Sequence, residues 1–214
     1  MIRILLADDH VLFRSGARRI LEEQSDFVVV AEAGSGVEAV QLAGQYRPDV
    51  AILDIGMKEL NGIEAAAQVQ AASPQTAILI LSMHSDERYV TGAVRAGARG
   101  FLMKDSVEQG LLEAVRQVHA GHAYFSSAVA LILRKRQASG AGKPEPEDPY
   151  ETLTGRERHI YQLLAEGNGS KQIAADLGIS VHTVETHRTR IMDKMDLHGI
   201  AELVLSAVRR GLVS

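Results

Sequence analysis

Residues 4–9 read ILLADD, residues 50–55 read VAILDI and residues 100–104 read GFLMK. Each run is short and apolar, and each carries charge at or near its end. Such runs are typical of strands buried inside a parallel sheet. In these sheets the carboxyl ends of the strands form the edge where ligands bind. The charged residues predicted to meet at this edge are Asp8, Asp9, Asp54 and Lys104.

Apolar runs of strand length alternate with amphipathic segments from Ile2 to about Gly121. Five strand–helix units in succession predict an α/β domain whose parallel sheet is covered on both faces by helices. The expected strands are Ile2–Ala7, Phe27–Ala33, Val50–Ile55, Ala77–Met83 and Gly100–Met103. The expected helices are His10–Gln24, Val37–Gln45, Gly62–Ala72, Glu87–Ala96 and Val107–Ala120.

The composition bounds the class of protein. A chain of 214 residues is long enough for two small domains. Its apolar runs are far shorter than a membrane span, and a strand starting at Ile2 leaves no room for a signal peptide. The absence of cysteine excludes disulfides and thiolate zinc sites and fits a cytoplasmic protein, and no His-x3-His pair indicates a structural metal.

A second, all-helical domain is predicted after a linker. Ser127–Gln137 has the composition of a short extra helix, and the following ASGAGKPEPEDP is rich in Gly, Pro and charge, as linkers are. Beyond it, Thr154 and Glu157 form a capping box, and the turn Gly178-Ile179-Ser180 separates two helices as in a helix-turn-helix unit. The expected helices are Arg156–Ala165, Ser170–Leu177, Ser180 to about Met195, and Ile200–Arg210.

The clustered carboxylates favour phosphate chemistry with a divalent cation, because like charges crowd together at a cost unless a cation joins them. Asp54 is the nucleophile candidate. Asp8 and Asp9, with Asp54 itself, are the candidate ligands of Mg²⁺ or Mn²⁺. Gly56 could add a backbone carbonyl as a further metal ligand, Lys104 would pair with a carboxylate and then with the phosphoryl group, and Ser82 would offer a hydroxyl.

These residues resemble the receiver domains of bacterial two-component response regulators. The resemblance rests on Asp8-Asp9-His10, Leu53-Asp54-Ile55-Gly56-Met57, Asn61-Gly62, Leu81-Ser82 and Gly97–Lys104, and it covers about residues 1–120. It implies a flavodoxin-like sheet of five parallel strands in the order 2-1-3-4-5. It also implies that Asp54 accepts a phosphoryl group from a sensor histidine kinase and slowly loses it, and that Ser82 and Phe101 form a switch in which Phe101 rotates inward.

One departure from the family lies beside this site. The family usually has Pro after Met57, where this chain has Lys58. Proline stiffens a loop, so Lys58 either loosens it or is a solvated lysine with little effect on phosphorylation. A further hypothesis is that Gly56 and His84 flank the acyl phosphate and tune its lifetime by controlling access of water.

Residues 150–214 resemble the LuxR-type helix-turn-helix, and the whole chain is similar to response regulators of the NarL/FixJ type. The helix Val181–Met195 is expected in the major groove, with Val184, Ile191 and Met195 packed inward. Residues 151–214 carry eight basic and eight acidic residues, so charge alone does not indicate nucleic-acid binding. The low net charge predicts weak binding by each monomer, so a dimer on two half-sites about 34 Å apart is expected. The candidate DNA-contacting residues are Thr183, Glu185, Thr186, His187, Arg188, Thr189, Arg190 and Lys194.

Two further departures concern helix starts in this segment. Gly155 stands where the family usually has Pro, and Gly169 stands where it often has a Ser cap. Both changes should lower helix stability modestly, Gly155 by up to about 1 kcal/mol. Neither removes a candidate DNA contact.

The sequence thus predicts a receiver in residues 1–121, a linker with a possible short helix in 122–149, and a DNA-binding domain in 150–214. The expected function is transcription regulation through phosphorylation of Asp54, with double-stranded DNA, a homodimeric partner and RNA polymerase, and no membrane. The alternatives are a DNA binder that ignores phosphorylation, a phosphorelay or phosphate-sink protein, and a metal-dependent phosphatase. No separate substrate pocket is evident for the last, so a metabolic enzyme is not expected.

Overall fold

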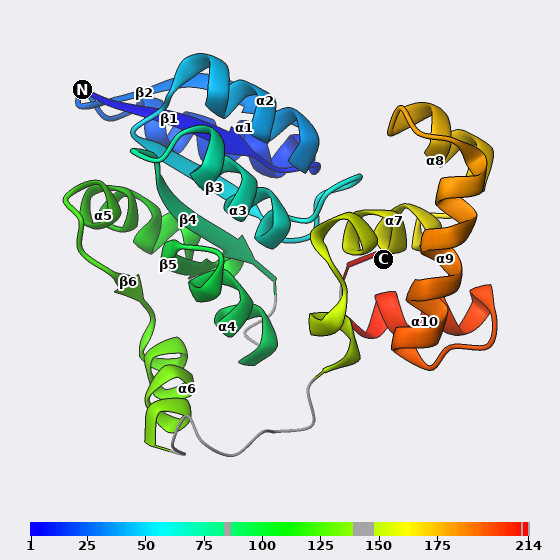
Figure 1. Ribbon diagram of the computed structural model, residues 1–214. Coiled ribbons are helices and arrows are strands. Elements are labelled where there is room, and N and C mark those ends of the chain that lie inside the picture. Colours follow the sequence, from blue (N-terminus) through cyan, green and yellow to red (C-terminus); the bar gives the residue numbers. More distant parts are fainter. Residues whose placement is uncertain (84–86, 139–147, 211, 214) are drawn as a thin grey trace. The chain divides into compact units, whose positions relative to one another are not determined.

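The computed structural model describes residues 1–83, 87–138, 148–210 and 212–213 (Figure 1). The chain divides into two compact units, Met1–Ala141 and Gly142–Ser214. Two hydrophobic clusters lie in the first unit and one in the second, so each unit has its own core. None of the helices among these residues is long and apolar enough to cross a membrane.

The first unit is built on a parallel sheet with the strand order β2-β1-β3-β4-β5-β6. The register of β1 on β3 pairs Ala7 with Leu53, which brings the carboxyl ends of these two strands side by side. The predicted α/β class and the order of the first five strands are confirmed. The strands are β1 (Ile2–Ala7), β2 (Phe27–Ala33), β3 (Val50–Asp54), β4 (Ala77–Ser82), β5 (Ala98–Met103) and β6 (Tyr124–Phe125).

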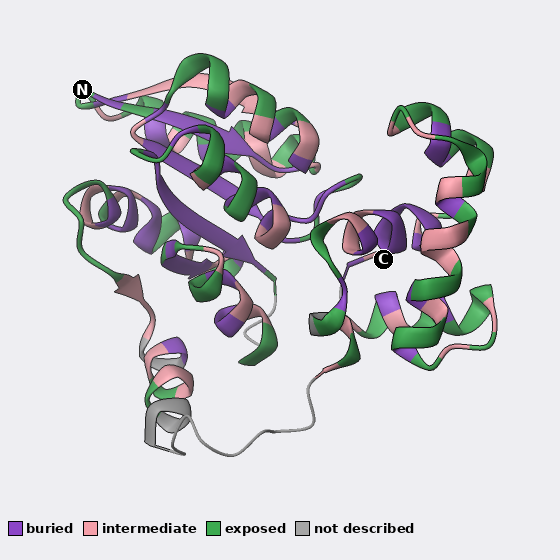
Figure 2. Cartoon of the chain, viewed as in Figure 1, coloured by how far each residue is buried: buried purple, intermediate pink, exposed green. Residues whose placement is uncertain are grey.

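Helices cover both faces of this sheet, as the alternation of apolar runs predicts. Alternate strand residues point to opposite faces, so Leu5 joins one cluster and Ile4 the other. The cluster with Ile4 lies under α1 and α5, and the cluster with Leu5 lies under α2, α3 and α4, with the strands buried between them (Figure 2). The helices are α1 (Val11–Glu22), α2 (Gly36–Tyr46), α3 (Gly62–Ala72), α4 (Glu87–Arg95) and α5 (Val107–His119).

The sheet has one strand more than the five predicted, and the possible short helix predicted at Ser127–Gln137 is present in the structure. Tyr124 and Phe125 pair with Gly100 and Phe101 as the short strand β6. The following helix α6 (Ser127–Ala138) buries Val129 completely in the core under α4. A two-residue strand has no readable alternation, so only its pairing with β5 reveals it.

The second unit contains only helices among its described residues. A short 3-10 turn, η2 (Pro149–Thr152), precedes the helices, and Thr154 and Glu157 form the predicted capping box at the start of α7. The core includes Tyr161, Val184, Ile191 and Leu203. The predicted four-helix domain is confirmed, with α7 (Gly155–Ala165), α8 (Ser170–Asp176), α9 (Val181–Met195) and α10 (Ile200–Arg209).

Candidate functional site

Four strand ends bring the predicted charged and polar residues to one edge of the sheet. Asp8 follows β1, Asp54 ends β3, Ser82 ends β4, and Lys104 follows β5. The Lys104 Nζ atom lies 2.7 Å from Asp8 Oδ2 and 3.0 Å from Asp54 Oδ2. The side chains are almost fully buried, with 5% of Lys104, 4% of Asp54 and none of Asp8 exposed. One ammonium therefore joins two buried carboxylates, whereas the sequence predicted that Lys104 would pair with one.

The electrostatics of this cluster leave it short of positive charge. Burial and the nearby Asp8 carboxylate raise the pKa of Asp54 above its ordinary value, although Lys104 and the Gly56 backbone amide oppose the rise. The Lys104 Nζ atom also lies 4.6 Å from the centre of the Phe13 ring, whose face favours a cation. Asp9 adds a third carboxylate, so a further cation would relieve the crowding.

The donor atoms fit a divalent metal ion. Asp8, Asp9, His10 and Asp54 each offer a ligand atom, and these atoms lie within 4.8 Å of one another. The buried oxygens Asp8 Oδ2 and Asp9 Oδ1 have no hydrogen-bond partner in the part of the chain that the structure describes, although Lys104 forms an ion pair with the former and His10 Nδ1 lies 2.9 Å from the latter. Carboxylate oxygens in such an arrangement suit Mg²⁺ or Mn²⁺.

His10 was missed as a candidate at this site. Its Nδ1 atom lies 2.9 Å from Asp9 Oδ1 and 3.4 Å from Asp8 Oδ1, and 71% of its side chain is exposed. The search for a pair of histidines could not find it, because its neighbours are carboxylates. The only signal in the sequence is its place directly after Asp8 and Asp9.

The turn after β3 is held tightly against Asp54. The Asn61 side chain accepts hydrogen bonds from the amides of Ile63 and Glu64, both at 3.0 Å, and so caps α3. The Gly62 amide donates to the Ile55 carbonyl at 3.0 Å. A Cβ atom on Gly62 would lie 2.0 Å from the Asp54 carbonyl oxygen, so only glycine fits. This contact explains the Asn61-Gly62 motif physically.

Lys58, which replaces the usual proline, lies in the same loop. Its side chain is exposed, its backbone forms a bridge with Ser35, and its carbonyl accepts a hydrogen bond from the Leu60 amide at 2.7 Å. Ser35 also hydrogen-bonds Glu59 at 3.1 Å. These contacts hold the loop without proline, and the Lys58 side chain is exposed to solvent.

The predicted switch residues lie inside the fold. Ser82 is 2% exposed and pairs with Met103 of β5 through the sheet. Phe101 is fully buried and belongs to the core under α4. Phe101 is therefore already inside the core, and this structure does not show the exposed state from which it would rotate inward. His84, the predicted neighbour of the phosphoryl group, lies outside the described residues.

The predicted DNA-reading surface lies on α9. Val184, Ile191 and Met195 are buried as predicted. The hydroxyls of Thr186 and Thr189 donate to carbonyls of their own helix, at 2.9 Å and 3.1 Å. The candidate contact residues that are exposed or half-buried are Thr183, Glu185, Thr186, His187, Arg188, Thr189, Arg190 and Lys194.

Lys194 pairs with groups outside its own helix, whereas the hydroxyls of Thr186 and Thr189 bond within it. Its Nζ atom lies 2.7 Å from Glu157 Oε2 and 3.2 Å from the Thr152 carbonyl oxygen. Burial alone would raise the pKa of Glu157, but the hydrogen bonds from Lys194 and from the Thr154 amide lower it overall. Lys194 thus ties α9 to the capping box of α7, which the sequence did not predict.

The helix α8 begins without a side-chain cap, as expected for Gly169 in place of serine. No side-chain hydrogen bond caps its first turn. The helix α9, in contrast, is capped by Ser180, whose hydroxyl accepts a hydrogen bond from the Thr183 amide at 3.0 Å.

Comparison with known proteins agrees with these two units. The model of the response regulator receiver domain matches residues 4–116, and that of the luxR family of bacterial regulatory proteins matches residues 151–207. The chain is 38% identical over 215 residues to the oxygen regulatory protein NreC of Staphylococcus aureus, with 99% of each chain covered.

Two solved structures are similar as well. A LuxR-family two-component response regulator from Aurantimonas sp. SI85-9A1 is 32% identical with a TM-score of 0.61, covering 64% of this chain and 99% of that one. The response regulator ChrA of a heme-sensing two-component system is 33% identical with a TM-score of 0.52, covering 99% and 98%. The chain therefore belongs to the two-component response regulators that join a receiver domain to a LuxR-type DNA-binding domain, a family of transcription regulators and not of metabolic enzymes.

Proposed function

We propose that Asp54 accepts a phosphoryl group from a sensor histidine kinase and that this modification controls dimerisation and DNA binding. The observation that carries the proposal is the position of Lys104, whose ammonium contacts both Asp8 and Asp54 in a buried cluster. A lysine held between two buried carboxylates can move its ion pair to the oxygens of a phosphoryl group on one of them. Residues 1–121 would hold the phosphoacceptor function and residues 150–214 the DNA-binding function, with 122–149 between them.

The transfer itself needs an oxygen nucleophile and neutralisation of the phosphoryl oxygens. A carboxylate oxygen of Asp54 attacks phosphorus, the bond from phosphorus to the kinase histidine nitrogen breaks, and an acyl phosphate forms on Asp54. Lys104 moves from its carboxylate partners to the new phosphoryl oxygens. Ser82 donates its hydroxyl to one of these oxygens. Later attack by water on phosphorus releases phosphate and restores the Asp54 carboxylate.

A divalent metal ion, Mg²⁺ or Mn²⁺, fits beside these residues. Asp8, Asp9 and Asp54 would hold it through carboxylate oxygens, with the Gly56 carbonyl as a further ligand. When bound, such an ion neutralises part of the negative charge on the phosphoryl oxygens. The His10 ring lies beside the Asp9 carboxylate, so it adjoins the proposed metal position.

The output is proposed to act through α9. Phosphorylation at the carboxyl ends of the strands is coupled through Ser82 and Phe101 to the α4–β5 side of the receiver. Dimerisation then presents two copies of α9 to successive turns of the major groove, where Glu185, Thr186 and Thr189 read base edges. Thr183, His187, Arg188 and Lys194 contact the phosphate backbone, and Arg190 lies nearby. The bound dimer acts on RNA polymerase. Because DNA and RNA polymerase lie in the bacterial cytoplasm, we place the protein there.

Phosphorylation can be tested with a small phosphodonor. The full chain is incubated with acetyl phosphate and Mg²⁺ and measured by intact-protein mass spectrometry. We expect the parent to gain one phosphoryl group and Asp54→Asn to gain none. Asp105→Asn removes an exposed carboxylate one residue after Lys104 and serves as the matched control, which should label like the parent. Equal labelling of Asp54→Asn and the parent would exclude Asp54 as the acceptor.

DNA binding is tested by an electrophoretic shift on the promoter of the protein's own operon, with and without phosphodonor. A shift that strengthens with phosphorylation and is lost on Glu185→Ala supports the proposal. A shift that is the same in both conditions identifies a DNA binder that ignores phosphorylation. Labelling without any shift on this promoter identifies a phosphate sink.

A further inference from the structure

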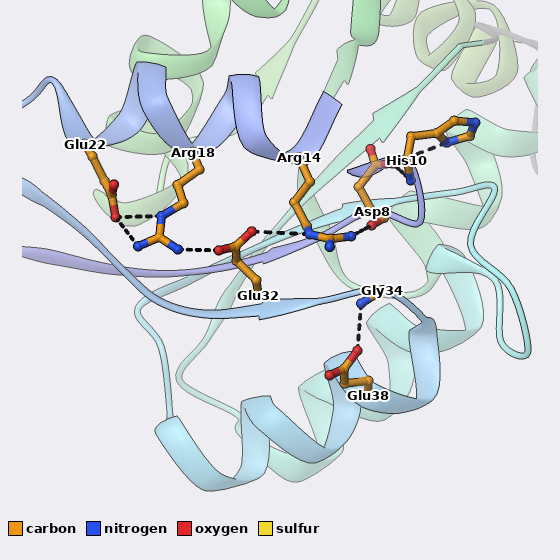
Figure 3. Close-up of polar contacts among 8 residues, drawn as sticks. All are labelled: Asp8, His10, Arg14, Arg18, Glu22, Glu32, Gly34 and Glu38. Carbon is orange, nitrogen blue, oxygen red and sulfur yellow. Dashed lines mark hydrogen bonds and ion pairs between the residues drawn. The ribbon is translucent and has the colours of Figure 1, made fainter. Parts of the chain in front are cut away.

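A ladder of ion pairs runs along α1 toward the phosphoacceptor site (Figure 3). The Arg18 Nη2 atom lies 2.9 Å from Glu22 Oε1, and another Arg18 nitrogen contacts Glu32 of β2. Arg14, one turn earlier on α1, donates from Nε to Glu32 Oε2 at 3.3 Å. Its Nη1 group donates to the backbone carbonyl of Asp8. The ladder therefore ends on the main chain of a candidate metal ligand.

The other polar groups of Asp8 are held as well. Its amide donates to the Ala33 carbonyl at 3.1 Å, and Oδ1 accepts from the His10 amide at 2.8 Å. The carboxylate also pairs with Lys104 through Oδ2. The carbonyl is the remaining polar group, and Arg14 is its partner. Because Asp9 follows directly, fixing this carbonyl also fixes the peptide from which the second carboxylate projects.

We propose that Arg14 is a positioning residue for the metal site, acting through the Asp8 carbonyl on the carboxylates of Asp8 and Asp9. This inference rests on the proposed metal-binding function of those two residues. Arginine suits the role because its rigid fork donates to Glu32 and to Asp8 at the same time. Only 18% of the Arg14 side chain is exposed, and Arg18 on the other side of Glu32 keeps that carboxylate in place.

The charge of Arg14 and its geometry have opposite effects on metal affinity, so the sign of a mutational effect separates them. Removing a cation from the neighbourhood of three carboxylates strengthens binding of a divalent ion by Coulomb attraction. Releasing the Asp8 carbonyl loosens the ligands and weakens binding, and outer partners of metal ligands typically contribute about tenfold or more to affinity. The positioning role therefore predicts weaker binding in spite of the more negative site.

The experiment measures Mg²⁺ affinity by isothermal titration calorimetry on the full chain without phosphodonor. We expect Arg14→Gln to weaken affinity about tenfold. Arg14→Lys should also weaken it several-fold, because lysine keeps the charge but lacks the rigid fork that places two separate nitrogens, Nε and Nη1, against Glu32 and Asp8. Arg19→Gln is the matched control, since it removes the same charge from α1 and an exposed ion pair with Glu23, neither of which involves Glu32 or Asp8. Its affinity should stay within about twofold of the parent.

Circular dichroism at the titration temperature checks that each variant is folded, and Arg14→Lys preserves the test if Arg14→Gln does not fold. Affinity of Arg14→Gln equal to or tighter than that of the parent would overturn the positioning role. Full rescue by Arg14→Lys would do so too, because charge alone would then suffice. If the parent itself binds no Mg²⁺, the proposed metal site fails and the inference fails with it, whereas a parent that binds isolates the failure to Arg14.

Discussion

Replacing Gly62 by alanine should displace the phosphoacceptor itself. The new Cβ atom would start 2.0 Å from the Asp54 carbonyl oxygen and 2.7 Å from its carbonyl carbon, whereas ordinary contacts begin at 3.4 Å. The two backbones must therefore move apart by about 1.4 Å, the difference between 3.4 and 2.0 Å. Overpacking of this kind costs about 1–3 kcal/mol, and a strained hydrogen bond from the Gly62 amide to Ile55 adds about 1 kcal/mol.

We expect the free energy of unfolding of the receiver to fall by about 2–4 kcal/mol. The rate of labelling by acetyl phosphate should fall as well. A misplacement of about 1 Å can cost on the order of a hundredfold in rate. Urea unfolding followed by circular dichroism measures the first quantity. Intact-mass time courses in saturating Mg²⁺, under conditions where the variant is folded, measure the second.

Gly16→Ala is the matched control for this substitution. Gly16 lies inside α1, and a Cβ atom there would meet nothing within 4 Å. Alanine at that position should stabilise the helix by about 0.5–1 kcal/mol and leave labelling unchanged. Labelling of Gly62→Ala at the parent rate, with an unchanged free energy of unfolding, would refute the argument that close approach to Asp54 requires glycine.

Three further predictions concern charge. Asp54→Asn should raise the free energy of unfolding at about pH 7 without Mg²⁺, because the raised pKa of Asp54 means that its ionisation costs stability as the pH rises; an unchanged or lower value would contradict this. Adding Mg²⁺ should stabilise the parent more than Asp54→Asn, measured by thermal unfolding, and equal gains would argue against Asp54 as a ligand. Lys194→Met should destabilise the second unit by about 1–2 kcal/mol, reduced from the value for a fully buried pair because Lys194 is 35% exposed. Because the pKa of Glu157 is lowered, the ionised Glu157 stabilises the fold above about pH 4.3, and this stabilisation is lost as the pH falls through the lowered pKa. The parent should therefore lose more stability on acidification than Lys194→Met. Urea unfolding at several pH values measures this, and an equal loss of unfolding free energy in the two proteins would contradict it.

Local patterns in the sequence carried much of the fold. Each of the first five strands is an apolar run, so its type and approximate bounds follow from periodicity. The capping box of Thr154 and Glu157 spans only four residues and is confirmed for the same reason. The short strand β6 and the packing of α6 were missed, because their partners Phe101 and α4 lie far from them in the chain.

The candidate site was likewise predicted in part from the sequence. The sequence by itself determined that Asp8, Asp9, Asp54 and Lys104 meet, because parallel strands bring their carboxyl ends to one edge. It did not determine which atoms pair, and only the tertiary structure shows one ammonium shared between Asp8 and Asp54.

Two further features were decided by tertiary structure alone. The pair of Lys194 with Glu157 joins residues 37 positions apart and holds a candidate DNA contact inside the domain. The contact of Arg14 with the Asp8 carbonyl depends on how α1 lies against β2, because Glu32 orients the guanidinium. The sequence determined where charge gathers, since strand and helix periods are local. The packing of distant elements determined which charge each group meets, because side-chain direction and distance have no local signature.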